Sequence, residues 1–153
     1  MKSVRKAVRT FLIQDNKVLA RRYIKKDLEG YYDVPGGKIE EGETLKATIV
    51  REFREEAGIT VLDPQYAGNL IVEYPDRIYD FSIFVATKYK KEQIENIDGI
   101  PEFIEIDNLL KKEKLLAEVY LLDKNHYNDL INKTNFKFHF VTDANRTKVE
   151  EIK

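Results

Sequence analysis

Short apolar runs and alternating apolar and polar residues recur along this chain, and such patterns predict strands. The first segment ends on the run Phe11-Leu12-Ile13, and turn-forming residues at 14–17 lead it into a second segment. By the same criteria we predict strands at residues 4–13, 18–22, 60–62, 66–73, 78–88, 103–106, 136–141 and 147–152. Residues 90–99 are expected to form a polar loop.

Two regions follow a helical period instead. Between Glu43 and Gly58 apolar residues recur every three or four positions, at Leu45, Ile49, Val50, Phe53 and Ala57. We expect this helix to begin at Glu43-Thr44, because an acidic group suits the positive end of the helix dipole, and to stop at Gly58. A later helical pattern covers residues 107–131, with a break or an exposed turn at the charged residues 111–114. Together these patterns predict one α/β sandwich, a mixed sheet with a helical layer on each face.

Three carboxylates stand out in the first predicted helix. Glu52, Glu55 and Glu56 are spaced i, i+3 and i+4, so they project from one helical face, where like charges repel one another. Carboxylate oxygens gathered in this way suit a hard divalent cation such as Mg²⁺. The competing interpretation is a solvated acidic face neutralised by Arg51 and Arg54.

The loop before the helix favours the cation site over that alternative. Residues 35–37 read Pro-Gly-Gly, a rigid turn in which the backbone approaches a ligand closely. A tight loop followed by a helix with a carboxylate triplet is far more specific than an acidic helix alone.

Residues 37–59, GKIEEGETLKATIVREFREEAGI, resemble the signature of the Nudix hydrolases, and every fixed position of that signature is filled. A looser similarity to MutT-type members runs from the first strand to residue 106, including Arg21-Arg22, residues 34–37 and residues 74–77. Residues 136–152 are similar to the C-terminal hairpin of some Gram-positive members that act on oxidised nucleotides. The resemblance implies a Nudix-type α/β/α sandwich with a mixed β-sheet, formed by residues 1–153 as a single domain.

The resemblance also implies the metal ligands. Glu52, Glu55 and Glu56 correspond to the main ligands of Mg²⁺, for which Mn²⁺ can substitute, and the Gly36 carbonyl corresponds to a further ligand. Members often add an acid from the loop before a later strand. Here Asp98 fits the MutT-type spacing, with Glu102 as the alternative and a plain turn residue as the other interpretation of Asp98.

Further roles follow from the same resemblance. Arg51 corresponds to the residue that orients the carboxylates, with Glu43 as its partner. Glu52 is the first choice as general base on the attacking water and Glu55 the second, because the family does not use one invariant base.

On the substrate side, Arg22 and Arg77 are expected to contact phosphate or base, since a guanidinium fork suits phosphate. The alternative for each arginine is an ordinary surface charge. Val34 occupies the position of an apolar wall beside the base. Tyr74 and Phe81 are candidates for stacking on the base, although core positions are the more common role for such aromatic residues.

Composition narrows the class of protein further. The chain has 153 residues, no cysteine and a formal net charge of −1, so it offers no thiolate chemistry and no overall attraction to nucleic acid polymers or membranes. Residues 1–26 nevertheless carry nine basic and one acidic residue, a local balance of +8. We expect either a charged sheet edge there or cations that face a polyphosphate. A cytoplasmic monomer or homodimer is the simplest expectation, with structural roles for His126 and His139.

Three functions compete at this point. The first is a Mg²⁺-dependent enzyme that hydrolyses nucleoside triphosphates, oxidised purines such as 8-oxo-dGTP included, to the monophosphate and pyrophosphate. The second is another Nudix diphosphatase acting on ADP-ribose or dinucleoside polyphosphates. Beyond the signature, family members that act on ADP-ribose often carry a proline and those that act on dinucleoside polyphosphates a tyrosine. Pro75 and Tyr74 match both patterns, so this feature does not separate the two substrates. The third is a catalytically silent nucleotide-binding regulatory domain, which the intact carboxylate set disfavours.

Overall fold

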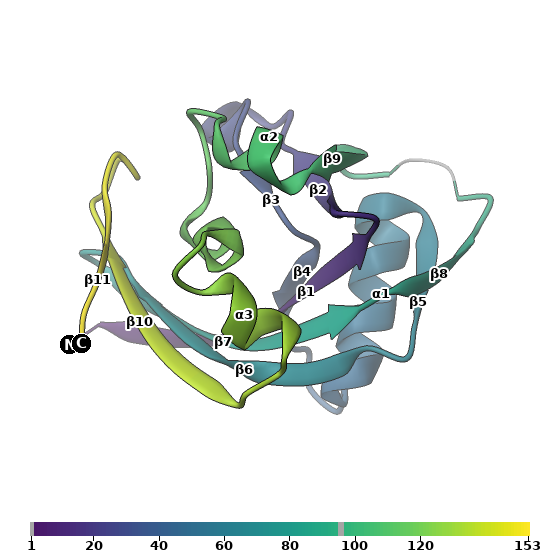
Figure 1. Ribbon diagram of the computed structural model, residues 1–153, viewed down its shortest axis with the longest axis horizontal. Coiled ribbons are helices and arrows are strands. Elements are labelled where there is room, and N and C mark those ends of the chain that lie inside the picture. The colour runs from purple at the N-terminus through teal and green to yellow at the C-terminus, as the bar shows by residue number, and fades with distance from the viewer. Residues whose placement is uncertain (1, 95–96) are drawn as a thin grey trace.

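A curled mixed β-sheet forms the centre of the computed structural model, which describes residues 2–94 and 97–153 (Figure 1). Within those residues the main sheet has the order β11-β10-β6-β7-β1-β2-β3, with β4 paired to β1 and β9 paired to β2. Its strands are β1 (Ser3–Gln14), β2 (Lys17–Arg22), β3 (Tyr32–Asp33), β4 (Gly36–Lys38), β6 (Gln65–Glu73), β7 (Arg77–Ala86), β9 (Ile100–Glu105), β10 (Phe136–Thr142) and β11 (Val149–Glu151). The mixed sheet predicted from the sequence is confirmed.

A second, two-stranded sheet differs from the prediction. It pairs β5 (Ile59–Leu62) with β8 (Lys88–Lys91) in antiparallel register. Residues 88–91 were expected to end one strand and begin the polar loop, but β7 ends at Ala86 and residues 88–91 pair with β5 instead. Residues 95 and 96 of that predicted loop lie outside the described residues.

Strand β1 organises the site. It runs parallel to β7, with Val8 opposite Ser82, and antiparallel to β4, with Val8 opposite Gly37. Strand β4 comes this close only because Gly36 lacks a side chain: a Cβ there would lie 2.0 Å from the Val8 carbonyl oxygen. The glycine loop is therefore fixed against β1.

Helix α1 (Leu45–Ala57) begins and ends where the sequence predicts. The Thr44 hydroxyl accepts a hydrogen bond from the Ala47 amide, and Gly58 closes the helix in the left-handed region with φ of +67°. Its buried side, with Ile49 and Phe53, packs on one face of β1 through a cluster that also contains Val8, Leu12, Leu19 and Phe84. This packing holds the polar side of α1 over the glycine loop.

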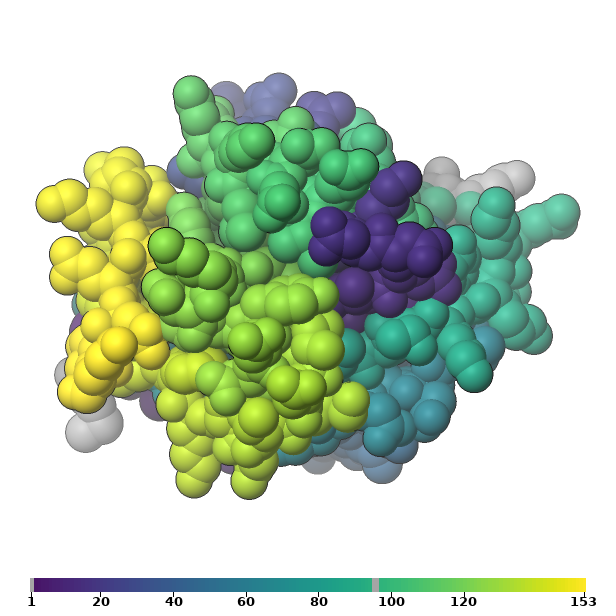
Figure 2. Space-filling model, in the orientation of Figure 1, coloured from purple at the N-terminus to yellow at the C-terminus, as the bar shows by residue number. Residues whose placement is uncertain are grey.

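The other face of the sheet carries the later helical region, which is not one long helix. It consists of α2 (Ile106–Leu110), the 3₁₀ helix η2 (Ala117–Leu122) and α3 (Tyr127–Ile131), and a short 3₁₀ helix η1 (Lys26–Leu28) precedes β3. The expected break at residues 111–114 is confirmed, because the chain leaves α2 there. Figure 2 shows this region and the C-terminal strands covering the near side of the molecule.

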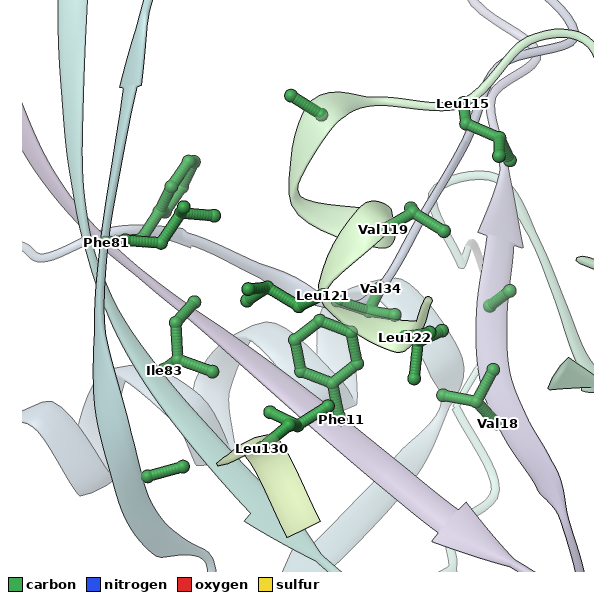
Figure 3. Packing of buried hydrophobic residues seen from close by; sticks show 14 of the residues in the cluster. Phe11, Val18, Val34, Phe81, Ile83, Leu115, Val119, Leu121, Leu122 and Leu130 are labelled. Atoms are coloured by element: carbon green, nitrogen blue, oxygen red, sulfur yellow. The ribbon is translucent and has the colours of Figure 1, made fainter. Parts of the chain in front are cut away.

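The larger core lies between η2, α3 and the sheet. Figure 3 shows Phe11 of β1 packed among Val34, Leu121, Leu122 and Leu130. With α1 on the opposite face, the arrangement is the α/β/α sandwich that the sequence predicts. Among residues 2–94 and 97–153, no helix is both long enough and apolar enough to cross a membrane.

Candidate active site

One cleft with two cavities runs along β1 and β7, the first cavity beside β4 and α1 and the second beside η2. The first cavity, of about 310 Å³, is lined by residues that include Gly37, Glu52 and Glu56. The second cavity, of about 100 Å³, shares four lining residues with the first: Arg9, Tyr23, Tyr79 and Phe81. A hollow of about 630 Å³ on the outer side of α1 is lined by that helix alone, so it is an open surface feature.

The basic N-terminal segment contributes directly to this cleft. Arg5, Lys6 and Arg9 of β1 line the first cavity together with Lys38 of β4. Four cations therefore surround the same cavity as two signature carboxylates. Of the two expectations for this segment, the geometry favours cations that face an anionic ligand.

Glu52 lies against the glycine loop. A Cβ built on Gly37 would be 2.7 Å from the Glu52 carboxylate, so only glycine leaves room for this approach. Arg51 Nη1 contacts Glu52 Oε1 at 2.7 Å and holds the carboxylate at the cavity wall.

Glu56 is buried one turn further along the helix. Its Oε1 accepts a hydrogen bond from the Gly36 amide at 2.9 Å, and its Oε2 lies 3.0 Å from Arg21 Nη1. Burial raises the pKa of Glu56 above the usual range, and the charges of Arg21 and Arg9 oppose part of that rise. A further positive charge in the first cavity would favour the ionised carboxylate.

Arg51 joins the helix to the loop that precedes it. Its Nε and Nη2 contact the two carboxylate oxygens of Glu43 at 2.8 and 2.9 Å, and Nη2 also donates to the Lys38 carbonyl oxygen at 3.2 Å. The hydrogen bonds from Arg51 lower the pKa of Glu43 to about 2. Glu43 therefore stays ionised at neutral pH and keeps the guanidinium in place.

The two candidates for the distal acid differ in position. The Asp98 amide donates to the Glu55 carbonyl oxygen at 3.1 Å, and its carboxylate is 3.7 Å from Arg21 Nη1. Glu102 is exposed on β9, opposite Ala20 of β2. Asp98 is thus the candidate that contacts the end of α1.

The NUDIX domain family model matches residues 4–127. The chain therefore belongs to the NUDIX domain family. An 8-oxo-dGTP diphosphatase of Proteus vulgaris is 35% identical over 81 residues, which cover 53% of this chain and 72% of that protein. An uncharacterized Nudix hydrolase of Bacillus subtilis is 30% identical and covers 71% of each chain. An ADP-ribose pyrophosphatase of Methanocaldococcus jannaschii is 38% identical over 71 residues, covering 46% of this chain and 41% of that protein.

Solved structures share this Nudix fold. The crystal structure of a MutT protein from Bacillus halodurans matches with a TM-score of 0.75 and 21% identity, covering 97% of this chain and 95% of that one. The expected resemblance to MutT-type Nudix hydrolases is confirmed, and so is the fold class.

Nudix hydrolases use divalent metals, and the residues at the first cavity supply suitable donors. Glu52 and Glu56 line the cavity, while the Glu55 side chain is 57% exposed on the same helix. Across residues 2–94 and 97–153 no three acidic or imidazole groups converge, and arginines contact both Glu52 and Glu56. Glu52, Glu55 and Glu56 would supply the carboxylate oxygens of such a site. The backbone at Gly37 lies close to the Glu52 carboxylate. Oxygen donors gathered in this way fit a hard cation.

The three expected substrate contacts have different positions in this Nudix structure. Arg77 lines the second cavity, and its guanidinium lies 4.3 Å from the Tyr74 ring centre. Arg22 is exposed and lines neither cavity, because strand alternation turns Arg21 inward and Arg22 outward. Val34 is completely buried in the core between η2 and the sheet, and it too lines neither cavity.

Several polar residues that line the cavities or lie beneath them were given no role from the sequence. They are the buried Arg9, Arg21, Asp33 and Glu118 and the half-buried Tyr23 and Arg146. Arg9 interrupts the apolar run of β1, and Glu118 stands between apolar residues of η2. A charge inside an apolar run was the signal that could have identified these two residues.

Proposed function

We propose that this Nudix hydrolase converts a nucleoside triphosphate to the monophosphate and pyrophosphate in a Mg²⁺-dependent reaction, with oxidised purines such as 8-oxo-dGTP among its substrates. The observation that carries the proposal is the first cavity, where Glu52 and Glu56 face the cations Arg5, Lys6 and Lys38. Carboxylates suit the metal and the cations suit the polyphosphate, so both parts of a metal–triphosphate complex find opposite charges there. The similarity to an 8-oxo-dGTP diphosphatase supports the substrate class.

Each residue has a chemical role in this proposal. Glu52, Glu55 and Glu56 would hold the cation, which supplies charge neutralisation and a more acidic water. Glu52, held at the cavity wall by Arg51, takes the proton of the attacking water. The water oxygen bonds to one of the two phosphorus atoms of the α–β anhydride, the bond from that phosphorus to the bridging oxygen breaks, and its electron pair leaves with the other product. Arg5, Lys6 and Lys38 stabilise the negative charge on the leaving group.

A substrate panel tests the proposal. We expect kcat/KM for 8-oxo-dGTP or dGTP to exceed that for ADP-ribose and diadenosine tetraphosphate under one Mg²⁺ concentration, with products resolved by chromatography. A tenfold or greater preference for either of the last two would overturn the triphosphate proposal and leave the family assignment intact. That outcome would favour the second candidate, which the similarity to an ADP-ribose pyrophosphatase supports.

Arg77 and Arg22 form a matched pair for testing the second cavity. Arg77→Ala is expected to weaken substrate binding by roughly 1.5–3 kcal/mol, the range for hydrogen bonds to charged groups, mainly as a higher KM. Arg22→Ala removes the same charge outside both cavities, so its kinetics at moderate salt should match those of the parent. The opposite ranking of the two variants would place the substrate on the outer side of β2.

A further inference from the structure

A continuous chain of buried ion pairs crosses the floor of the cleft. Glu56 contacts Arg21 at 3.0 Å, and Arg21 contacts Asp33 through Nη2 and Nε at 3.2 and 3.3 Å. Asp33 then accepts from Arg9 Nη1 at 2.9 Å, and Arg9 Nε lies 2.8 Å from Glu118. We call these five residues the buried ion-pair chain. None is more than 9% exposed.

The two ends of the buried ion-pair chain lie in different cavities. Glu56 lines the first cavity, Glu118 lines the second, and Arg9 lines both. The residues come from distant parts of the sequence, on α1, β1, β2, β3 and η2. The chain of contacts therefore links the signature helix to the layer on the opposite face of the sheet.

Asp33 is the centre of this arrangement. It is fully buried, and its carboxylate accepts hydrogen bonds from Arg9, Arg21 and the Tyr23 hydroxyl, the last at 2.7 Å. Both arginines are thus fixed by one carboxylate, and Arg21 is one of two groups that hold Glu56. One guanidinium, that of Arg21, thus contacts both Asp33 and Glu56, so a displacement of Asp33 is expected to displace Glu56 through Arg21.

Stability alone is a weak reason for five buried charges. Desolvation costs several kcal/mol per ion, and well-packed apolar replacements are often neutral or stabilising. Paired guanidinium and carboxylate groups do, however, restrict side-chain positions more than apolar packing does, because a guanidinium forms its hydrogen bonds in only a few geometries. Such a restriction would hold the Glu56 carboxylate in the position where it binds a cation.

We propose that Asp33 and Arg21 are positioning residues for Glu56, and that Arg9 couples Glu118 in the second cavity to the placement of Glu56 in the first. Contact of a ligand with Glu118 or Arg9 then changes cation affinity at the other end of the cleft, and cation binding changes ligand affinity by the same factor. The role of Glu56 rests on the proposed function. The linkage itself rests on the contacts.

The test uses three variants of the full chain and one control. Asp33→Asn removes the central charge, Tyr23→Phe removes only one hydroxyl donor to Asp33, and Glu118→Gln removes the charge at the far end. Glu151→Gln is the control, since it removes the charge of a carboxylate that lies 2.9 Å from the buried His126 and lines neither cavity. Mn²⁺ affinity without substrate, hydrogen exchange of the Gly36 amide, kcat and KM are measured for each variant.

Asp33→Asn is expected to weaken Mn²⁺ binding by about tenfold or more, the usual effect of losing a partner behind a metal ligand. Its kcat should fall while KM changes little, and the Gly36 amide, which donates to Glu56, should exchange faster. Glu118→Gln should weaken Mn²⁺ binding by about fivefold although it lies in the other cavity. Tyr23→Phe should shift Mn²⁺ affinity in the same direction by a smaller factor, and Glu151→Gln should match the parent.

Several results would overturn the inference. If Asp33→Asn lowers Tm but leaves Mn²⁺ affinity and Gly36 exchange as in the parent, the buried ion-pair chain is structural only. If Asp33→Asn does not fold, the Tyr23→Phe variant decides. A parental rate of hydrogen exchange at its Gly36 amide would also show that the buried ion-pair chain is structural only. Parent-like Mn²⁺ affinity in Glu118→Gln removes the coupling between the cavities. A parent protein that binds no Mn²⁺ contradicts the proposed function instead, and Gly36 exchange then decides the positioning role alone.

Discussion

Replacing Glu52 or Glu56 by Gln is expected to lower kcat by at least about a hundredfold, because each change removes a carboxylate charge that the cation and the attacking water require. Glutamine keeps nearly the same volume, and its amide oxygen can still accept the hydrogen bond that the Gly36 amide donates to Glu56. Turnover of 8-oxo-dGTP at saturating Mg²⁺, measured beside Tm without metal, separates loss of chemistry from loss of fold.

The matched control is Glu41→Gln, which removes an exposed carboxylate from the loop before α1 and lines neither cavity. Its kcat should equal that of the parent. Near-normal turnover in both Glu52→Gln and Glu56→Gln would exclude the first cavity as the site of chemistry. A large loss in the control would show that overall negative charge, rather than position in the cleft, governs the rate.

The sequence predicted the signature helix well because its signals are local. Thr44 caps the first turn, Gly58 adopts the left-handed conformation at the end, and Ile49 and Phe53 repeat at helical spacing. Each feature acts within a few residues, so no knowledge of the sheet was needed. The longer strands followed for the same reason, since alternation and turn residues are also local signals, whereas the short strands β3, β4 and β8 were not predicted.

The later helical region was harder to predict because its apolar residues serve two structures. Leu115 and Leu116 keep the spacing of a helix, yet Leu116 hydrogen-bonds to Tyr32 and Leu115 forms a parallel bridge with that residue. Pairing with β3 thus interrupts the helix after residues 111–114. The partner lies more than 80 positions away in the sequence, where periodicity carries no information about it.

The choice between Arg21 and Arg22 shows a different limit. Adjacent residues of a strand point to opposite faces, and two neighbouring arginines give no sign of which one is inside. Only the pairing of β2 with β3 and β9 makes Arg21 the buried member, next to Asp33 and Glu56. The sequence therefore indicates two arginines at the end of β2 without showing which of them is buried.

Gly37→Ala is expected to lower kcat by about a hundredfold while the protein still folds, since an angstrom-scale displacement of a catalytic group can cost that much. The new Cβ would lie 2.7 Å from the Glu52 carboxylate, and the flexible end of that side chain must move away from the cavity wall. Kinetics with 8-oxo-dGTP and urea unfolding of the same preparation provide the measurement.

Two further variants make the cause specific. In a Glu52→Ala background the added methyl group meets no carboxylate, so Gly37→Ala should then change neither stability nor residual activity, as a double-mutant cycle would show. Gly36→Ala is the contrasting case, because its Cβ would lie 2.0 Å from the Val8 carbonyl oxygen, a backbone atom that cannot rotate away. It should separate β4 from β1 and lower the free energy of unfolding by more than the roughly 1–3 kcal/mol typical of overpacking. A Gly37→Ala protein with parental kcat would show that Glu52 acts from a position other than the wall of the first cavity.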